Sequence, residues 1–151
     1  MTQARIMGAA QWFLRLTLAA GFLAAVADRF GLWGPPGASN VAWGDWQSFV
    51  KYVAILNWFA PEPVIPALAW AATLAELLGA LGLLIGWQLR WVALEGGLLL
   101  LSFALTMTMA LGIKAPLDFS VFGVAAGAFL LAAMSWESER SSELAERCEA
   151  S

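Results

Sequence analysis

Four long apolar stretches, separated by shorter polar or turn-forming segments, dominate the pattern of this chain. They cover residues 6–27, 66–86, 91–113 and 119–136, and none has a proline in its interior. A helix that crosses a bilayer needs about 20 mostly apolar residues. The pattern therefore predicts an all-α membrane protein, a bundle of four transmembrane helices. Tryptophans near the predicted ends fit an aromatic belt at the membrane interface: Trp12, Trp70, Trp87, Trp91 and Trp136.

The first loop, residues 28–65, is too long to be a simple connection between two helices. After a turn region with the sequence GPPG at residues 34–37, apolar residues recur at helical spacing through residues 45–59. Asp45 precedes this stretch as a candidate N-cap. We expect a short amphipathic helix that lies on the outer membrane face or over the mouth of the bundle. Both a packing lid and a ligand-gating lid fit this pattern.

The chain divides into one membrane domain, residues 1–136, and an acidic polar tail, residues 137–151. The first span also has features of a signal peptide, but Arg15 inside its apolar run favours a retained span. Four spans place both termini on one side of the membrane. A small excess of basic residues favours the cytoplasm for that side: Arg5, Arg90, Arg140 and Arg147 lie there, against Arg29, Lys51 and Lys114 on the other.

Composition supports the membrane class and removes several kinds of chemistry. The chain is 61% hydrophobic and 13% charged, whereas soluble domains average about 45–50% apolar and about 25% charged residues. The net charge of −3 comes mainly from the tail, and no basic face for nucleic acid is expected. With no histidine and the single cysteine Cys148, zinc enzymes, bis-histidine cytochromes, Ser-His-Asp hydrolases and cysteine-ligated clusters are excluded. No metal site is expected.

Three ionisable residues lie inside the predicted spans, and they are the first candidates for a site. Arg15, Glu76 and Glu95 each cost roughly 2.5–3.5 kcal/mol at a helix centre, so they should pair or line a path. At 1.5 Å per residue, Arg15 lies about 14 Å from the inner surface and Glu76 about 15 Å from the outer one. In a hydrocarbon core of about 30 Å both lie near the midplane, and we expect an Arg15–Glu76 ion pair.

The helix face that carries Glu76 also carries small residues, which indicates contact with another helix. Glu95 lies only about 6 Å inside the inner boundary. Asp118 precedes the fourth span and fits a helix cap. Each of these residues has two interpretations. Arg15 and Glu76 form either a catalytic or ligand-binding pair, or a purely structural pair. Glu95 is a ligand-binding group or a snorkelling side chain, and Asp118 is a ligand-binding group or a helix cap.

Three short stretches resemble the DoxX family of small four-span bacterial membrane proteins. They are RLTLAAGF at residues 15–22, AELLGALGLLIG at 75–86, followed by Arg90, and KAPLDFS at 114–120. The resemblance covers the chain to about residue 134, and the tryptophan-rich first loop and the acidic tail depart from it. It implies a multi-pass protein of the bacterial inner membrane that acts as a subunit or partner in quinone-linked redox chemistry.

The first functional hypothesis is therefore a membrane subunit of a quinone-linked oxidoreductase. Arg15 and Glu76 would bind the quinone headgroup or exchange protons with it. The quinone would be a bound substrate, not a covalent cofactor. Electrons would come from a soluble or membrane redox partner or from a reduced substrate.

Two other hypotheses belong to different classes. A non-enzymatic scaffold would anchor a soluble redox or stress protein through the acidic tail, although charged tails are more often only solvated. A small-solute or proton permease would use Arg15 and Glu76 as a midplane site. Because the sequence has no inverted repeat or broken helix, a permease would need a homo-oligomer.

Overall fold

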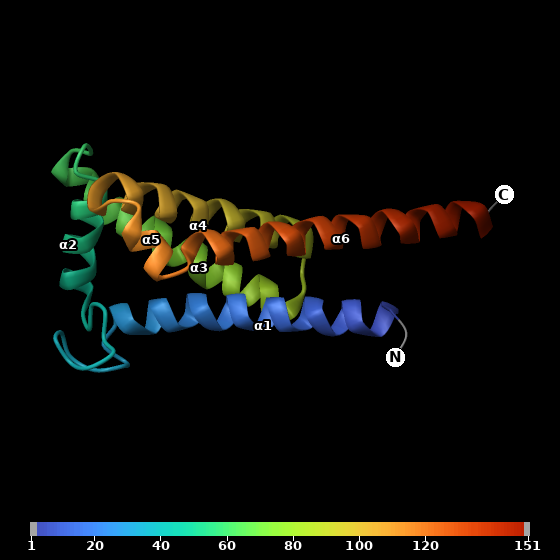
Figure 1. Cartoon of the computed structure of the whole chain (residues 1–151), viewed down its shortest axis with the longest axis horizontal. Helices are drawn as coiled ribbons and strands as arrows, with labels where there is room; N and C mark the ends of the chain where they lie inside the picture. Colours follow the sequence, from blue (N-terminus) through green and yellow to red (C-terminus); the bar gives the residue numbers. More distant parts are fainter. Residues whose placement is uncertain (1–2, 150–151) are drawn as a thin grey trace.

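The computed structural model describes residues 3–149, which are mostly helical and contain no strand. Four long helices form the bundle, and three short helical segments lie at one of its ends (Figure 1). The long helices are α1 (Gln3–Arg29), α3 (Ile65–Ile85), α4 (Leu89–Leu111) and α6 (Val121–Glu149). The short segments are α2 (Trp46–Leu56), the 3-10 turn η1 (Glu62–Val64) and α5 (Lys114–Asp118).

Within the described residues, four segments are long and apolar enough to cross a membrane: Arg5–Arg29, Glu62–Ile85, Leu89–Leu111 and Val121–Ser138. The predicted all-α bundle of four transmembrane helices is confirmed. The start of the fourth span was predicted two residues early, because Ser120 has a positive φ of 54° and separates α5 from α6. The described part of the acidic tail continues α6 as one helix to Glu149.

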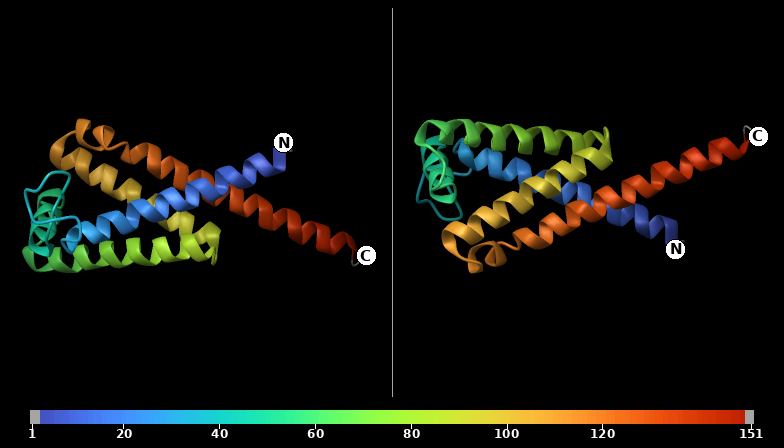
Figure 2. Two further views of the ribbon diagram at one scale, coloured as in Figure 1. Left: turned by 90° about the horizontal axis from the view of Figure 1, so that it is seen from below. Right: turned by 90° about the horizontal axis from the view of Figure 1, so that it is seen from above.

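The four long helices form two pairs, and the pairs diverge along the length of the bundle. The closest packing joins α4 to α6 and α1 to α3. The pairs approach each other most closely beside the α3–α4 turn and separate toward the end that holds α2, called here the loop end (Figure 2). The opposite end, toward which the chain termini lie, is called the termini end. The helix α2 contacts both α3 and α4 and so bridges the open side of this wedge.

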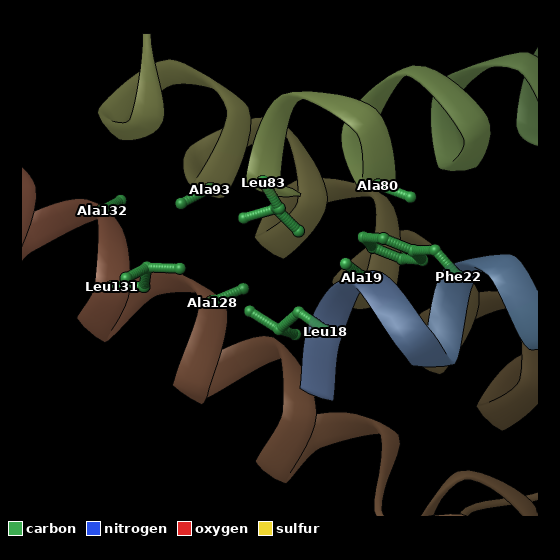
Figure 3. Close-up of a cluster of buried hydrophobic side chains, with 9 residues drawn as sticks. All are labelled: Leu18, Ala19, Phe22, Ala80, Leu83, Ala93, Ala128, Leu131 and Ala132. Carbon is green, nitrogen blue, oxygen red and sulfur yellow. The ribbon is translucent and has the colours of Figure 1, made fainter. Parts of the chain in front are cut away.

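Small side chains allow the two pairs to meet toward the termini end. Side chains of four helices point toward one another in a buried cluster (Figure 3). Alanine is its commonest residue, and small residues let helix backbones approach closely in a membrane. Its members are Leu18, Ala19, Phe22, Ala80, Leu83, Ala93, Ala128, Leu131 and Ala132. Within the α4–α6 pair, the helices also approach closely at Gly97 of α4, where a Cβ would lie 2.7 Å from the Phe129 ring of α6.

At the loop end, α2 begins as the sequence predicted. The carboxylate of Asp45 accepts a hydrogen bond of 2.7 Å from the Ser48 N–H, which satisfies a free donor of the first turn. Phe49 and Val53 of α2 then pack on Ile65 and Ala69 of α3 in a second buried cluster. The predicted amphipathic helix over the mouth of the bundle is confirmed.

Candidate ligand-binding cavity

A buried ion pair joins the end of α1 to the middle of α3. The Nη2 atom of Arg29 lies 2.8 Å from Oε1 of Glu76 and 2.6 Å from Oε2, and the two side chains are only 2% and 3% exposed. Arg29 Nη1 also donates a hydrogen bond of 2.7 Å to the Thr73 hydroxyl. On the α2 side, the guanidinium lies 3.9 Å from the ring centroid of Phe49. Arg29 is therefore fixed by contacts with both α3 and α2.

The expected Arg15–Glu76 pair is wrong, because Arg15 lies at the other end of α3. Its Nε donates a hydrogen bond of 2.9 Å to the Leu83 carbonyl, and its Nη2 donates one of 3.3 Å to the Leu84 carbonyl. These carbonyls belong to the last turn of α3, where free acceptors and the helix dipole favour a cation. Arg15 therefore caps α3 and does not contribute to a site with Glu76.

The error came from the assumed depth of α1. Residues 30–64 separate α1 from α3, so no short turn fixes their relative height. In the structure α1 projects beyond the α3–α4 turn at the termini end (Figure 2). Phe22 then lies beside Gly79, and Arg29 reaches Thr73 and Glu76.

Sequence reasoning missed Arg29 as a site residue, since it treated this residue as a flanking charge outside the membrane. One signal was available. An arginine at the last position of a span has a long apolar stem that can extend along neighbouring helices. Its Cα can therefore lie near the membrane boundary while its guanidinium reaches a buried acid.

A large cavity of about 1370 Å³ fills the wedge between the helix pairs. Every long helix contributes to its wall, and α2 and the first loop form its wall at the loop end. Most of the lining is apolar, and the charged side chains in it are Asp28, Arg29 and Glu76. The aromatic rings of Trp43, Phe49 and Tyr52 line the same space.

Three atoms of these charged residues are buried without a hydrogen-bond partner within residues 3–149: Arg29 Nε, Glu76 Oε2 and Asp28 Oδ1. Glu76 Oε2 has only its ionic contact with Arg29, and Asp28 uses its other oxygen to accept bonds from the Ala42 and Trp43 N–H groups. An unpaired polar atom in an apolar region is costly. These three atoms are themselves covered by neighbouring atoms, although their residues line the cavity.

The other two predicted site residues lie outside this cavity. Glu95 of α4 is half-buried against Gly79 and lines a separate, open hollow of about 480 Å³ between exposed Trp91 and Leu98. Asp118 ends α5 and forms an exposed ion pair with Lys114, so it does not lie in the first turn of α6. Of the four predicted site residues, only Glu76 lines the cavity.

The titration of Tyr52, the single tyrosine of the chain, measures how deeply this residue of α2 is buried beside the cavity. Burial raises the pKa of its phenol above the ordinary value of 10.0. Because the folded state favours the neutral phenol, this contribution to stability is complete below pH 10 and is lost as the pH rises through the folded-state pKa. We expect ultraviolet difference absorbance to place the tyrosine titration above that of the unfolded chain, and Tyr52→Phe to remove the signal. A coincident titration in folded and unfolded protein would show that the Tyr52 phenol is not buried in the folded state.

Together, the fold and the cavity define the class of this protein: a multi-pass integral membrane protein with an internal, mainly apolar cavity and a buried ion pair on its wall. Compared with known proteins, the chain matches no family model, no curated protein and no solved structure. The DoxX resemblance therefore stays a prediction that depends on three short motifs.

Proposed function

We propose that this protein binds the headgroup of a membrane quinone in the cavity and acts as a DoxX-like subunit or partner in quinone-linked redox chemistry. The observation that carries the proposal is a mainly apolar cavity whose wall includes the charged residues Asp28, Arg29 and Glu76. Ligand sites are typically apolar with a few convergent polar groups.

A quinone headgroup matches this wall in chemistry. Its carbonyl oxygens accept hydrogen bonds from a guanidinium such as that of Arg29, and the hydroxyls of the quinol donate to a carboxylate such as that of Glu76. The Trp43 and Phe49 rings supply flat apolar surface beside Arg29. The cavity exceeds the usual range of about 300–1,000 Å³, which leaves room for part of an isoprenoid tail.

Reduction of a quinone to a quinol consumes two electrons and two protons. Glu76 is the buried carboxyl that can exchange a proton at the headgroup. Because the chain has no histidine and one cysteine, we assign the electrons to a redox partner or a reduced substrate. The proposal places the protein in a bacterial inner membrane with both termini in the cytoplasm.

Quinone binding is tested directly on the purified protein in detergent. We expect decylubiquinone to quench tryptophan fluorescence saturably, because Trp43 lines the cavity, and lipid extraction to recover a co-purified quinone. Arg29→Lys keeps the positive charge beside Glu76 but removes the Nε donor. We expect it to weaken binding roughly tenfold, the size expected for a lost hydrogen bond to a charged group.

Arg15→Lys is the matched control, since Arg15 is also a membrane arginine but does not line the cavity. It should bind decylubiquinone as the wild type does. No saturable quenching in the wild type would overturn the quinone proposal. Equal binding by Arg29→Lys and the wild type would show that Arg29 does not hold the headgroup.

A further inference from the structure

We infer that the cavity is loaded from the bilayer through an opening between α1 and α6, and that the ligand's tail lies in that opening. The inference rests on the proposed quinone site and adds the class of ligand: an amphiphile dissolved in the membrane leaflet on the loop side. Water-soluble molecules would not enter by this route.

Protein covers most of both ends of the cavity. At the loop end, α2 covers it with the buried residues Phe49, Val53 and Leu56, and the lining there also includes exposed Leu111 and Phe119. Toward the termini end, the buried alanine-rich cluster joins all four long helices. An apolar ligand is therefore expected to enter from the side of the bundle, which faces lipid.

The α1–α6 side has the features of an entrance. The two helices cross near the middle of the bundle and diverge toward the loop end (Figure 2). On α1, the cavity wall there consists of the exposed residues Thr17, Gly21 and Ala24, and on α6 it includes exposed Val124. These side chains are absent or short, so they leave the space between the helices open around Gly21. Toward the loop end, exposed Trp33 donates a hydrogen bond to the Ala24 carbonyl and also lines the cavity.

The α3–α4 side of the wedge is covered by α2 where the two helices diverge. Its cavity wall includes the small residues Ala71 and Ser102 as well as Leu68, Leu99 and Phe103. The helix α2 contacts both α3 and α4 and so closes the space between them at the loop end. We therefore assign entry to the α1–α6 side, where Gly21 has no side chain.

Gly21 allows a direct test, because a Cβ added there would meet no atom within 4 Å. Gly21→Leu should fill the opening without disturbing the packing of the bundle. Gly123→Leu is the matched control: Gly123 is a helical, exposed glycine of α6, a Cβ on it also meets no atom within 4 Å, and it does not line the cavity. Both variants add no fluorophore, so tryptophan quenching remains comparable with the wild type.

The probes are decylubiquinone and the tailless quinone with the same ring, 2,3-dimethoxy-5-methylbenzoquinone. In Gly21→Leu we expect the affinity for decylubiquinone to fall roughly tenfold or more, since tail methylenes lose their place in the cavity. The affinity for the tailless quinone should change much less, and Gly123→Leu should match the wild type for both probes.

The outcomes separate this inference from the proposed function. If the wild type binds neither quinone, the quinone site itself is wrong. If Gly21→Leu binds decylubiquinone as tightly and as rapidly as the wild type, the quinone site stands and the α1–α6 entrance is wrong. An equal loss for both quinones in Gly21→Leu would also contradict the tail assignment, because only one of them has a tail.

Discussion

Replacing Arg29 with methionine should destabilise the folded bundle by about 3–5 kcal/mol, the usual cost of removing one partner of a buried ion pair. The loss is large because Glu76 is 3% exposed and its carboxylate would keep no ion-pair partner among the described residues. Thr73 would also lose the hydrogen bond that it accepts from Arg29. Thermal or denaturant unfolding in a fixed detergent measures the change.

A second variant separates the ion pair from simple packing. Arg29→Met combined with Glu76→Leu removes both charges and should recover much of the lost stability, because well-packed apolar residues often replace a buried pair without net cost. Lys114→Met is the control, since its exposed pair with Asp118 should contribute no more than about 1 kcal/mol. If the single Arg29 variant is as stable as the wild type, Glu76 has another partner and the pair does not hold α1 to α3.

The same double variant distinguishes a structural pair from a binding site. A purely structural pair can be replaced by apolar residues without affecting ligand binding. The proposed quinone site cannot, because Arg29 and Glu76 are the charged cavity-lining residues that would contact the headgroup. A stable double variant that no longer quenches with decylubiquinone would therefore support the site.

The sequence was sufficient to predict the helices because membrane spans are recognised from length and apolar composition alone. Asp45 and the helical spacing after it were enough for α2, since an N-cap and an amphipathic pattern are local features. The partner of Glu76 depends instead on the height of α1 against α3. That height is set by packing, such as Phe22 beside Gly79, and the long connection of residues 30–64 does not encode it.

The cavity could not be predicted for a related reason. It exists because small residues bring the helix pairs together near the termini end while α2 separates them at the loop end. Small residues on a span indicate close packing, and the sequence showed them beside Glu76. It did not show that the close packing is confined to one end, since this depends on which glycines and alanines face each other across different helices.

Gly97→Ala should destabilise the bundle by about 1–3 kcal/mol, the usual cost of overpacking a filled interface. Its new Cβ would lie 2.7 Å, 2.8 Å and 3.1 Å from three atoms of the Phe129 ring. Since α4 and α6 form the closest helix pair, either the ring must rotate away or the helices must move apart. The change in unfolding temperature in detergent measures the cost.

A compensating change makes this prediction specific. Phe129→Leu shortens the clashing side chain, so the double variant Gly97→Ala, Phe129→Leu should be less destabilised than the sum of its single variants. Gly123→Ala is the control, because it adds the same methyl group at a helical position where the new Cβ meets no atom within 4 Å. It should be neutral or stabilising, since alanine favours the helix more than glycine does. Equal losses for Gly97→Ala and Gly123→Ala would mean that α4 and α6 do not meet at Gly97. The α4–α6 pair, which forms one side of the wedge, would then need a different packing contact.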